Sequence, residues 1–143
     1  MSKKINFQFL ISYLGLIPYV LTFLDKYYFL IVEEEDLLNF IIYYSLIIIV
    51  FIGSINWNLK NNPPNHIVVY GFLPSLFAVI IIILSLLNTN ILIIFILIIL
   101  LLLTQLFFDY IILFAYETNK KAFNYLRLPL TVFITIFLFL ISL

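Results

Sequence analysis

The sequence predicts an all-α protein, an integral membrane bundle of transmembrane helices. Of its 143 residues, 66% are hydrophobic and only 10% are charged, a balance far outside that of soluble domains. A spanning helix takes about 20 residues, and the uncharged run over residues 61–108 could cross a bilayer twice. We therefore expect one domain over residues 1–143 with five transmembrane helices, at about residues 5–24, 37–57, 66–87, 91–116 and 125–142.

The first apolar stretch follows Lys3 and Lys4, a positive start that is also typical of a signal peptide. Its run over residues 5–24 is longer than the hydrophobic region of a signal peptide, and no small-residue cleavage site follows it. We therefore expect an uncleaved first helix. Pro18 lies inside it and should bend or break it, because proline removes a backbone hydrogen bond.

The first loop, residues 25–36, reads DKYYFLIVEEED and joins aromatic to acidic residues. Tyr27, Tyr28 and Phe29 suit a membrane interface, where aromatic rings lie half in water. The acidic residues at 33–36 come directly before the second helix, whose N-terminal dipole favours negative charge. They could hold a cation, but no histidine or cysteine accompanies them, so a solvated helix cap is the favoured interpretation.

The second and third helices form a hairpin with the most distinctive sequence in the chain. Its paired prolines, Pro63 and Pro64, cannot continue a helix and predict a turn. Small residues on both helices allow the close backbone approach that packs membrane helices together. The residues expected in this packing seam are Gly53, Ser54, Gly71, Pro74 and Ser75.

Two single residues of the hairpin have both a structural and a functional interpretation. Trp57 lies where the second helix meets the cytoplasmic membrane interface, and an anchor in the aromatic belt explains it without further function. His66 follows the proline turn and is interpreted as a capping or solvated residue, because no second histidine or cysteine is near it.

The cations lie unevenly on the two sides of a five-helix arrangement. With a cytoplasmic N-terminus, six of the seven Lys and Arg residues are cytoplasmic and only Lys26 is outside. By the positive-inside rule, the sequence predicts that the N-terminus is cytoplasmic and the C-terminus lies on the far side. The six inner cations are Lys3, Lys4, Lys60, Lys120, Lys121 and Arg127.

Asp109 is the strongest candidate for a functional residue, because it lies about 10 Å inside the end of the fourth helix. An ionised carboxylate at that depth costs much free energy unless it is paired with a cation or hydrated. Arg127 enters from the same side on the fifth helix, so a buried polar site with a structural ion pair, aided by Gln105 and Thr131, is favoured. The alternative is a transport role, since carboxylates inside a membrane often mark ion paths.

Composition argues against several other classes of function. Without cysteine there is no disulfide, thiolate metal site or cysteine nucleophile, and a net charge of zero gives no basic field for nucleic acid. No phosphate-binding loop, metal-ligand spacing or nucleophile–base set is present. We therefore expect a protein that is not an enzyme, with no catalytic residue, no cofactor, no metal and no evident soluble substrate.

Two functions remain. The favoured one is a non-enzymatic accessory or assembly protein that acts through contacts with membrane lipids and with other membrane proteins or itself. The alternative is a small transporter or a proton or ion path centred on Asp109, Gln105 and the polar end of the second helix.

Four blocks of the sequence resemble a known family. They are LGLIPY at 14–19, the stretch at 44–58 with its FIG and NWN cores, YGFLPSL at 70–76 and LRLPLT at 126–131. In these blocks the chain is similar to the small multi-pass family catalogued as domain of unknown function 3429, which includes bacterial inner-membrane proteins and the mitochondrial transmembrane protein 69. The resemblance implies a membrane fold and a bacterial inner membrane, and it implies no reaction.

The chain departs from that family at the end of the second helix, which there usually reads Gly-Gly-x-His-Trp-Gly. Ser54 replaces the second glycine, Asn56 the histidine and Asn58 the final glycine. A proton or metal role for that histidine therefore has no counterpart in this chain.

Overall fold

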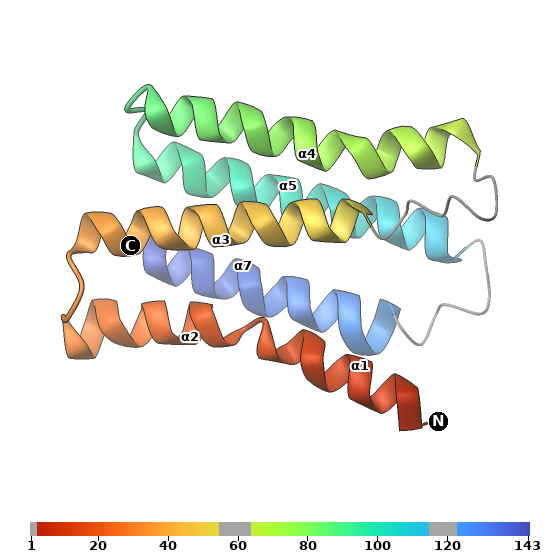
Figure 1. Cartoon of the computed structure of the whole chain (residues 1–143), viewed down its shortest axis with the longest axis horizontal. Helices are drawn as coiled ribbons and strands as arrows, with labels where there is room; N and C mark the ends of the chain where they lie inside the picture. Colours follow the sequence, from red (N-terminus) through yellow and green to blue (C-terminus); the bar gives the residue numbers. More distant parts are fainter. Residues whose placement is uncertain (1–2, 55–63, 115–122) are drawn as a thin grey trace. The chain divides into compact units, whose positions relative to one another are not determined.

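The computed structural model describes residues 3–54, 64–114 and 123–143, and all regular structure in these ranges is helical (Figure 1). Four long helices lie in them: α3 Glu34–Ser54, α4 Asn65–Leu86, α5 Ile91–Phe114 and α7 Leu128–Ser142. The first segment holds two shorter helices, α1 Lys3–Leu14 and α2 Ile17–Leu24. Two π-helical turns are η1 Asp25–Phe29, after α2, and η3 Phe123–Arg127, before α7.

Within the described residues, four segments are long and apolar enough to cross a membrane. The all-α prediction is confirmed, and so is the presence of several candidate membrane spans. The four segments are Glu34–Ser54, Asn65–Leu86, Ile91–Ile111 and Phe123–Ser142.

The first segment is broken, so it is not one of these four spans. The backbone amides of Gly15 and Leu16 donate to the carbonyls three residues earlier, at 3.2 and 3.0 Å, which makes a tight turn between α1 and α2. Pro18 lies in the first turn of α2, where its missing N–H leaves no hydrogen bond unmade. The break therefore comes just before Pro18, and neither piece alone can span a bilayer.

The long helices begin and end close to the predicted positions. The largest difference among the α-helix starts is at α3 and α7, each displaced by three residues from the expected start. In α3 the shift brings Glu34, Glu35 and Asp36 into the first turn, where negative charge complements the helix dipole. The parts of the expected helices at residues 55–57 and 115–116 lie outside the described residues.

By its internal contacts the chain divides into two compact units, residues 1–41 with 102–143 and residues 42–101. The prediction of one domain over residues 1–143 stays a prediction. In the first unit α2 packs along α7. The ring of Phe23 meets the ring of Phe137 edge-on at 6.0 Å between centroids, and Tyr19 and Leu138 are fully buried.

The second unit contains the later part of α3, all of α4 and the start of α5. A tight turn reverses the chain between α4 and α5 (Figure 1). Asn88 takes a left-handed conformation there, with φ 55°, which asparagine adopts more readily than most residues. The side-chain oxygen of Asn90 accepts the amide of Leu92 at 2.9 Å and so caps α5.

Candidate functional site

Asp109 and Arg127, both in the first unit, form an ion pair between α5 and η3. The guanidinium Nη2 of Arg127 donates to Oδ2 of Asp109. The Asp109 side chain is 4% exposed and the Arg127 side chain 15% exposed. A buried carboxylate is stabilised by a charge-assisted hydrogen bond of this kind, whereas either charge alone would be expensive to bury.

Local structure before α7 sets the position of Arg127. It is the last residue of η3, and Pro129 in the first turn of α7 fixes where the α-helix begins. The first residue of η3, Phe123, is buried, and its ring lies 5.7 Å from the ring of Tyr110, the neighbour of Asp109. This aromatic contact holds η3 against α5 beside the ion pair.

A hydrogen bond from α1 also reaches η3. The hydroxyl of Tyr13 donates to the backbone carbonyl of Tyr125 at 2.7 Å. A π-helical turn departs from the regular α-helical hydrogen-bond pattern, so its carbonyls are open to partners from other elements. Tyr13 thereby links the N-terminal helix to the turn that carries Arg127.

Gln105 and Thr131, the other two residues predicted for this site, are both 3% exposed. Gln105 precedes Asp109 by one helical turn, and Thr131 follows Arg127 by four residues, so each lies on the same helix face as its charged neighbour. The backbone carbonyl of Thr131 accepts the hydroxyl of Thr135 at 2.9 Å. A direct contribution of Gln105 or Thr131 to the ion pair stays a prediction.

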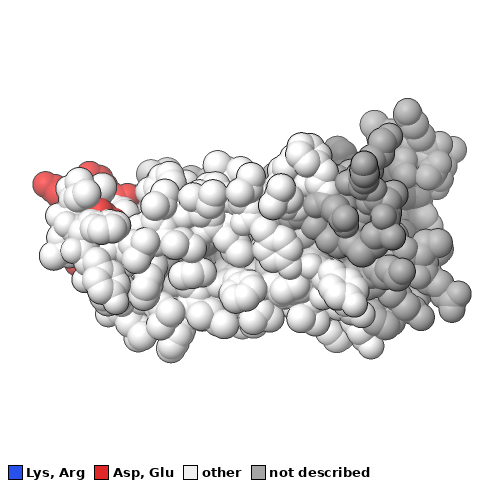
Figure 2. All heavy atoms as spheres, turned by 90° about the horizontal axis from the view of Figure 1, so that it is seen from below, with Lys and Arg blue, Asp and Glu red and all other residues white. Residues whose placement is uncertain are grey.

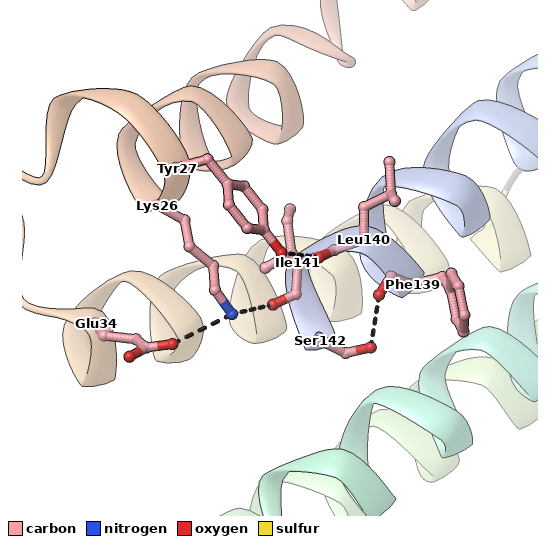
Figure 3. A network of polar contacts seen from close by, with 7 residues as sticks. All are labelled: Lys26, Tyr27, Glu34, Phe139, Leu140, Ile141 and Ser142. Atoms are coloured by element: carbon pink, nitrogen blue, oxygen red, sulfur yellow. Dashed lines mark hydrogen bonds and ion pairs between the residues drawn. The ribbon is translucent and has the colours of Figure 1, made fainter.

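A second polar contact, at the end of α7, was missed by the sequence analysis (Figure 3). The amine of Lys26 donates to the carbonyl of Ile141 at 2.7 Å and lies 3.2 Å from a carboxylate oxygen of Glu34. The hydroxyl of Tyr27 donates to the carbonyl of Leu140, also at 2.7 Å. The last carbonyls of a helix have no partner within it, and a cation there complements the dipole.

The only hint of this cap in the sequence is the position of Lys26, the single cation expected on the outer side. Its 13% exposed side chain turns inward to α7 and Glu34. Sequence reasoning counted Lys26 as a charge in a loop, but could not find its partner because Ile141 lies 115 residues further along the chain.

The packing seam of the second unit centres on Gly53. A Cβ atom at this position would lie 2.8 Å from Cγ of Pro74 and 2.9 Å from the carbonyl oxygen of Gly71. All three residues are buried, so the backbones of α3 and α4 approach closely here.

The two serines predicted for the seam bond within their own helices. Ser54 is exposed, and its hydroxyl donates to the carbonyl of Phe51 at 2.7 Å. Ser75 is half-buried and donates to the carbonyl of Phe72 at 2.7 Å. Trp57 lies outside the described residues.

The acidic cluster at residues 33–36 is exposed. Figure 2 shows acidic side chains gathered at the end of this face where α3 begins, and the other described atoms in view are uncharged. Among the residues that the structure describes, no group of three His, Asp or Glu residues is placed to hold a metal ion. His66 is exposed in the first turn of α4.

Comparison with known proteins gives a family match. The model of a family described as "Protein of unknown function (DUF3429)" matches residues 6–143. No curated protein matches the chain, and no solved structure matches it.

Proposed function

The chain belongs to the DUF3429 family, and we propose that it is a non-enzymatic accessory or assembly protein that acts inside the membrane. The four sequence blocks predicted this family, and the match over residues 6–143 confirms it. The chain is thus a multi-pass membrane protein from a family whose description names no reaction. The proposal concerns what its helices do there.

The Asp109–Arg127 ion pair carries the proposal. In an ion path the carboxylate of Asp109 would have to release its partner and bind a passing cation or proton. Here the partner is a guanidinium attached to the same chain, and separating a buried pair costs on the order of 3–5 kcal/mol. This arrangement favours a lasting contact between α5 and η3 over a site that exchanges ions.

The outer surfaces of the spanning helices support contacts with lipid or other membrane helices. On α3, for example, Phe40, Ile47 and Phe51 are all at least 50% exposed. Side chains of this kind are as well accommodated by lipid as by a neighbouring helix, so association depends on shape and packing. A protein with such faces and short connecting loops has its contact surface within the membrane.

We further propose five spans in a bacterial inner membrane, with a cytoplasmic N-terminus and the C-terminus on the far side. The fifth span is the first segment, expected over residues 5–24 and containing α1 and α2, and a stretch of this length covers about 30 Å at 1.5 Å per residue. The six-to-one distribution of cations supports this orientation.

A reporter fused to the C-terminus tests this topology. A reporter that is active only in the cytoplasm should be silent, and one active only beyond the membrane should function. The reverse pattern would show that the span number or the orientation is wrong.

Reconstitution separates the proposed function from the transport alternative. Vesicles containing the wild-type protein or Asp109→Asn should show no proton or alkali-cation flux above that of protein-free vesicles. Crosslinking in native membranes should instead capture a stoichiometric membrane protein or a second copy of the chain. A flux that Asp109→Asn abolishes would establish the ion path and contradict the accessory role.

A further inference from the structure

We propose that residues 27–32, called here the interfacial loop, insert into the lipid interface of the membrane. This inference does not depend on a protein partner. It concerns a loop whose residues were expected only in part, as aromatic side chains suited to an interface.

The interfacial loop consists of six consecutive aromatic or aliphatic residues, and the side chains of all six are exposed. Leu30 is 75% exposed and Ile31 is 80% exposed. A run of this length facing water is avoided in soluble surfaces unless it has a function, because every side chain orders water around apolar area. The loop is therefore matched to an apolar or half-apolar surrounding.

Three backbone amides of the loop, those of residues 30–32, donate to one residue, Asp25. The amide of Leu30 donates to the carbonyl of Asp25 at 2.8 Å, and the amides of Ile31 and Val32 donate to the Asp25 carboxylate at 3.3 and 3.1 Å. Asp25 is only 9% exposed, and Leu30 turns the chain in a left-handed conformation with φ 52°.

Whether the loop amides need an acceptor within the protein depends on whether water or lipid surrounds the loop. In water, exposed amides are satisfied by solvent and need no internal acceptor. In lipid no solvent replaces that acceptor, so irregular backbone is tolerated only where its polar groups have internal partners. A loop with inward amides and outward apolar side chains has the arrangement that a lipid surrounding requires.

The helices on either side of the loop also carry exposed apolar side chains, so the lipid that would surround them extends to the loop. Exposed Leu21 on α2 and Phe40 on α3 flank the loop in sequence, and α3 is one of the candidate spans. Directly after the loop come the exposed acidic residues 33–36, which belong in water. The boundary between the apolar loop and the acidic stretch marks the membrane interface. The charged amine of Lys26 does not lie among the loop side chains, because it contacts the carbonyl of Ile141 and the carboxylate of Glu34 (Figure 3).

The chain contains no cysteine, so single cysteines can carry a nitroxide label without a change of background. In vesicles of neutral phospholipid, the label at Ile31→Cys should collide more with dissolved oxygen than with a water-soluble nickel chelate. The label at Glu35→Cys, four residues away, should show the opposite preference. A label at the exposed Ile47 of α3 serves as the reference inside the bilayer.

Two results would overturn the inference. Equal nickel accessibility of the labels at positions 31 and 35 would place the loop in water. An immobile label at position 31 that neither reagent reaches would mean that protein, a second copy or a partner, covers the loop. Asp25→Ala should raise the mobility and nickel accessibility of the Ile31→Cys label, and Asp25→Asn should do so less; no change in either would contradict the role given to Asp25.

Discussion

Gly53→Ala tests the close approach of α3 and α4. The added methyl group would lie 2.8 Å from Cγ and 3.0 Å from Cβ of Pro74, and 2.9 Å from the carbonyl oxygen of Gly71. Ordinary contacts of a Cβ atom are 3.4–4 Å. The obstacles are a proline ring and a backbone carbonyl, neither of which can rotate away as a flexible side chain would, so the helices must separate.

Two opposing effects decide the size of the change in the free energy of unfolding. Replacing glycine by alanine inside a helix stabilises it by up to about 1 kcal/mol. Overpacking of a well-packed contact typically costs about 1–3 kcal/mol. We therefore expect a net destabilisation of up to about 2 kcal/mol, with the steric cost prevailing over the gain in helix propensity.

The measurement is unfolding in mixed micelles, followed by the loss of helical circular dichroism. Ser54→Ala is the matched control, since Ser54 is the next residue, is exposed, and its hydroxyl donates to the carbonyl of Phe51 in the same helix. It should change the free energy of unfolding by less than about 0.5 kcal/mol. If Gly53→Ala instead stabilises the protein by about 1 kcal/mol, the helices do not meet at this residue.

Two further predictions use the same assay. Tyr27→Phe removes the hydroxyl that donates to the carbonyl of Leu140 and should lower the free energy of unfolding by about 0.5–1.5 kcal/mol. The control Tyr28→Phe, at an exposed residue, should have almost no effect, and equal effects of the two variants would argue against the cap. Gly71→Leu adds a large side chain to the buried seam and should destabilise the protein in detergent, and a variant as stable as wild type would show that this face of α4 meets lipid.

The parts of the fold that follow from local sequence could be predicted. Apolar runs of spanning length located the four long helices, and the proline at position 18 indicated a break in the first segment. The proximity of Asp109 and Arg127 also followed from local reasoning, because few residues of sequence separate the end of one predicted helix from the start of the next.

Contacts between distant segments could not be predicted in this way. Lys26 and Tyr27 donate to carbonyls at the end of α7. The helical periodicity of apolar residues does not indicate which helix end, distant in the sequence, will lie beside a given loop. The same limit applies to Asp25, whose carboxylate accepts amides six and seven residues later only because Leu30 turns left-handed. The π-helical turns were missed because their hydrogen-bond pattern differs from that of an α-helix by one residue and leaves the apolar pattern nearly unchanged.

The double-mutant cycle of Asp109 and Arg127 tests most directly whether their ion pair is a structural contact. Arg127→Ala leaves a buried carboxylate without its guanidinium and should reduce the free energy of unfolding in mixed micelles by about 3–5 kcal/mol. Adding Asp109→Asn removes the stranded charge and should restore part of that loss, so the effects of the two single variants will not add. If the two losses simply add, the pair stabilises nothing, and Asp109 becomes a candidate for a functional carboxylate in a wet cavity.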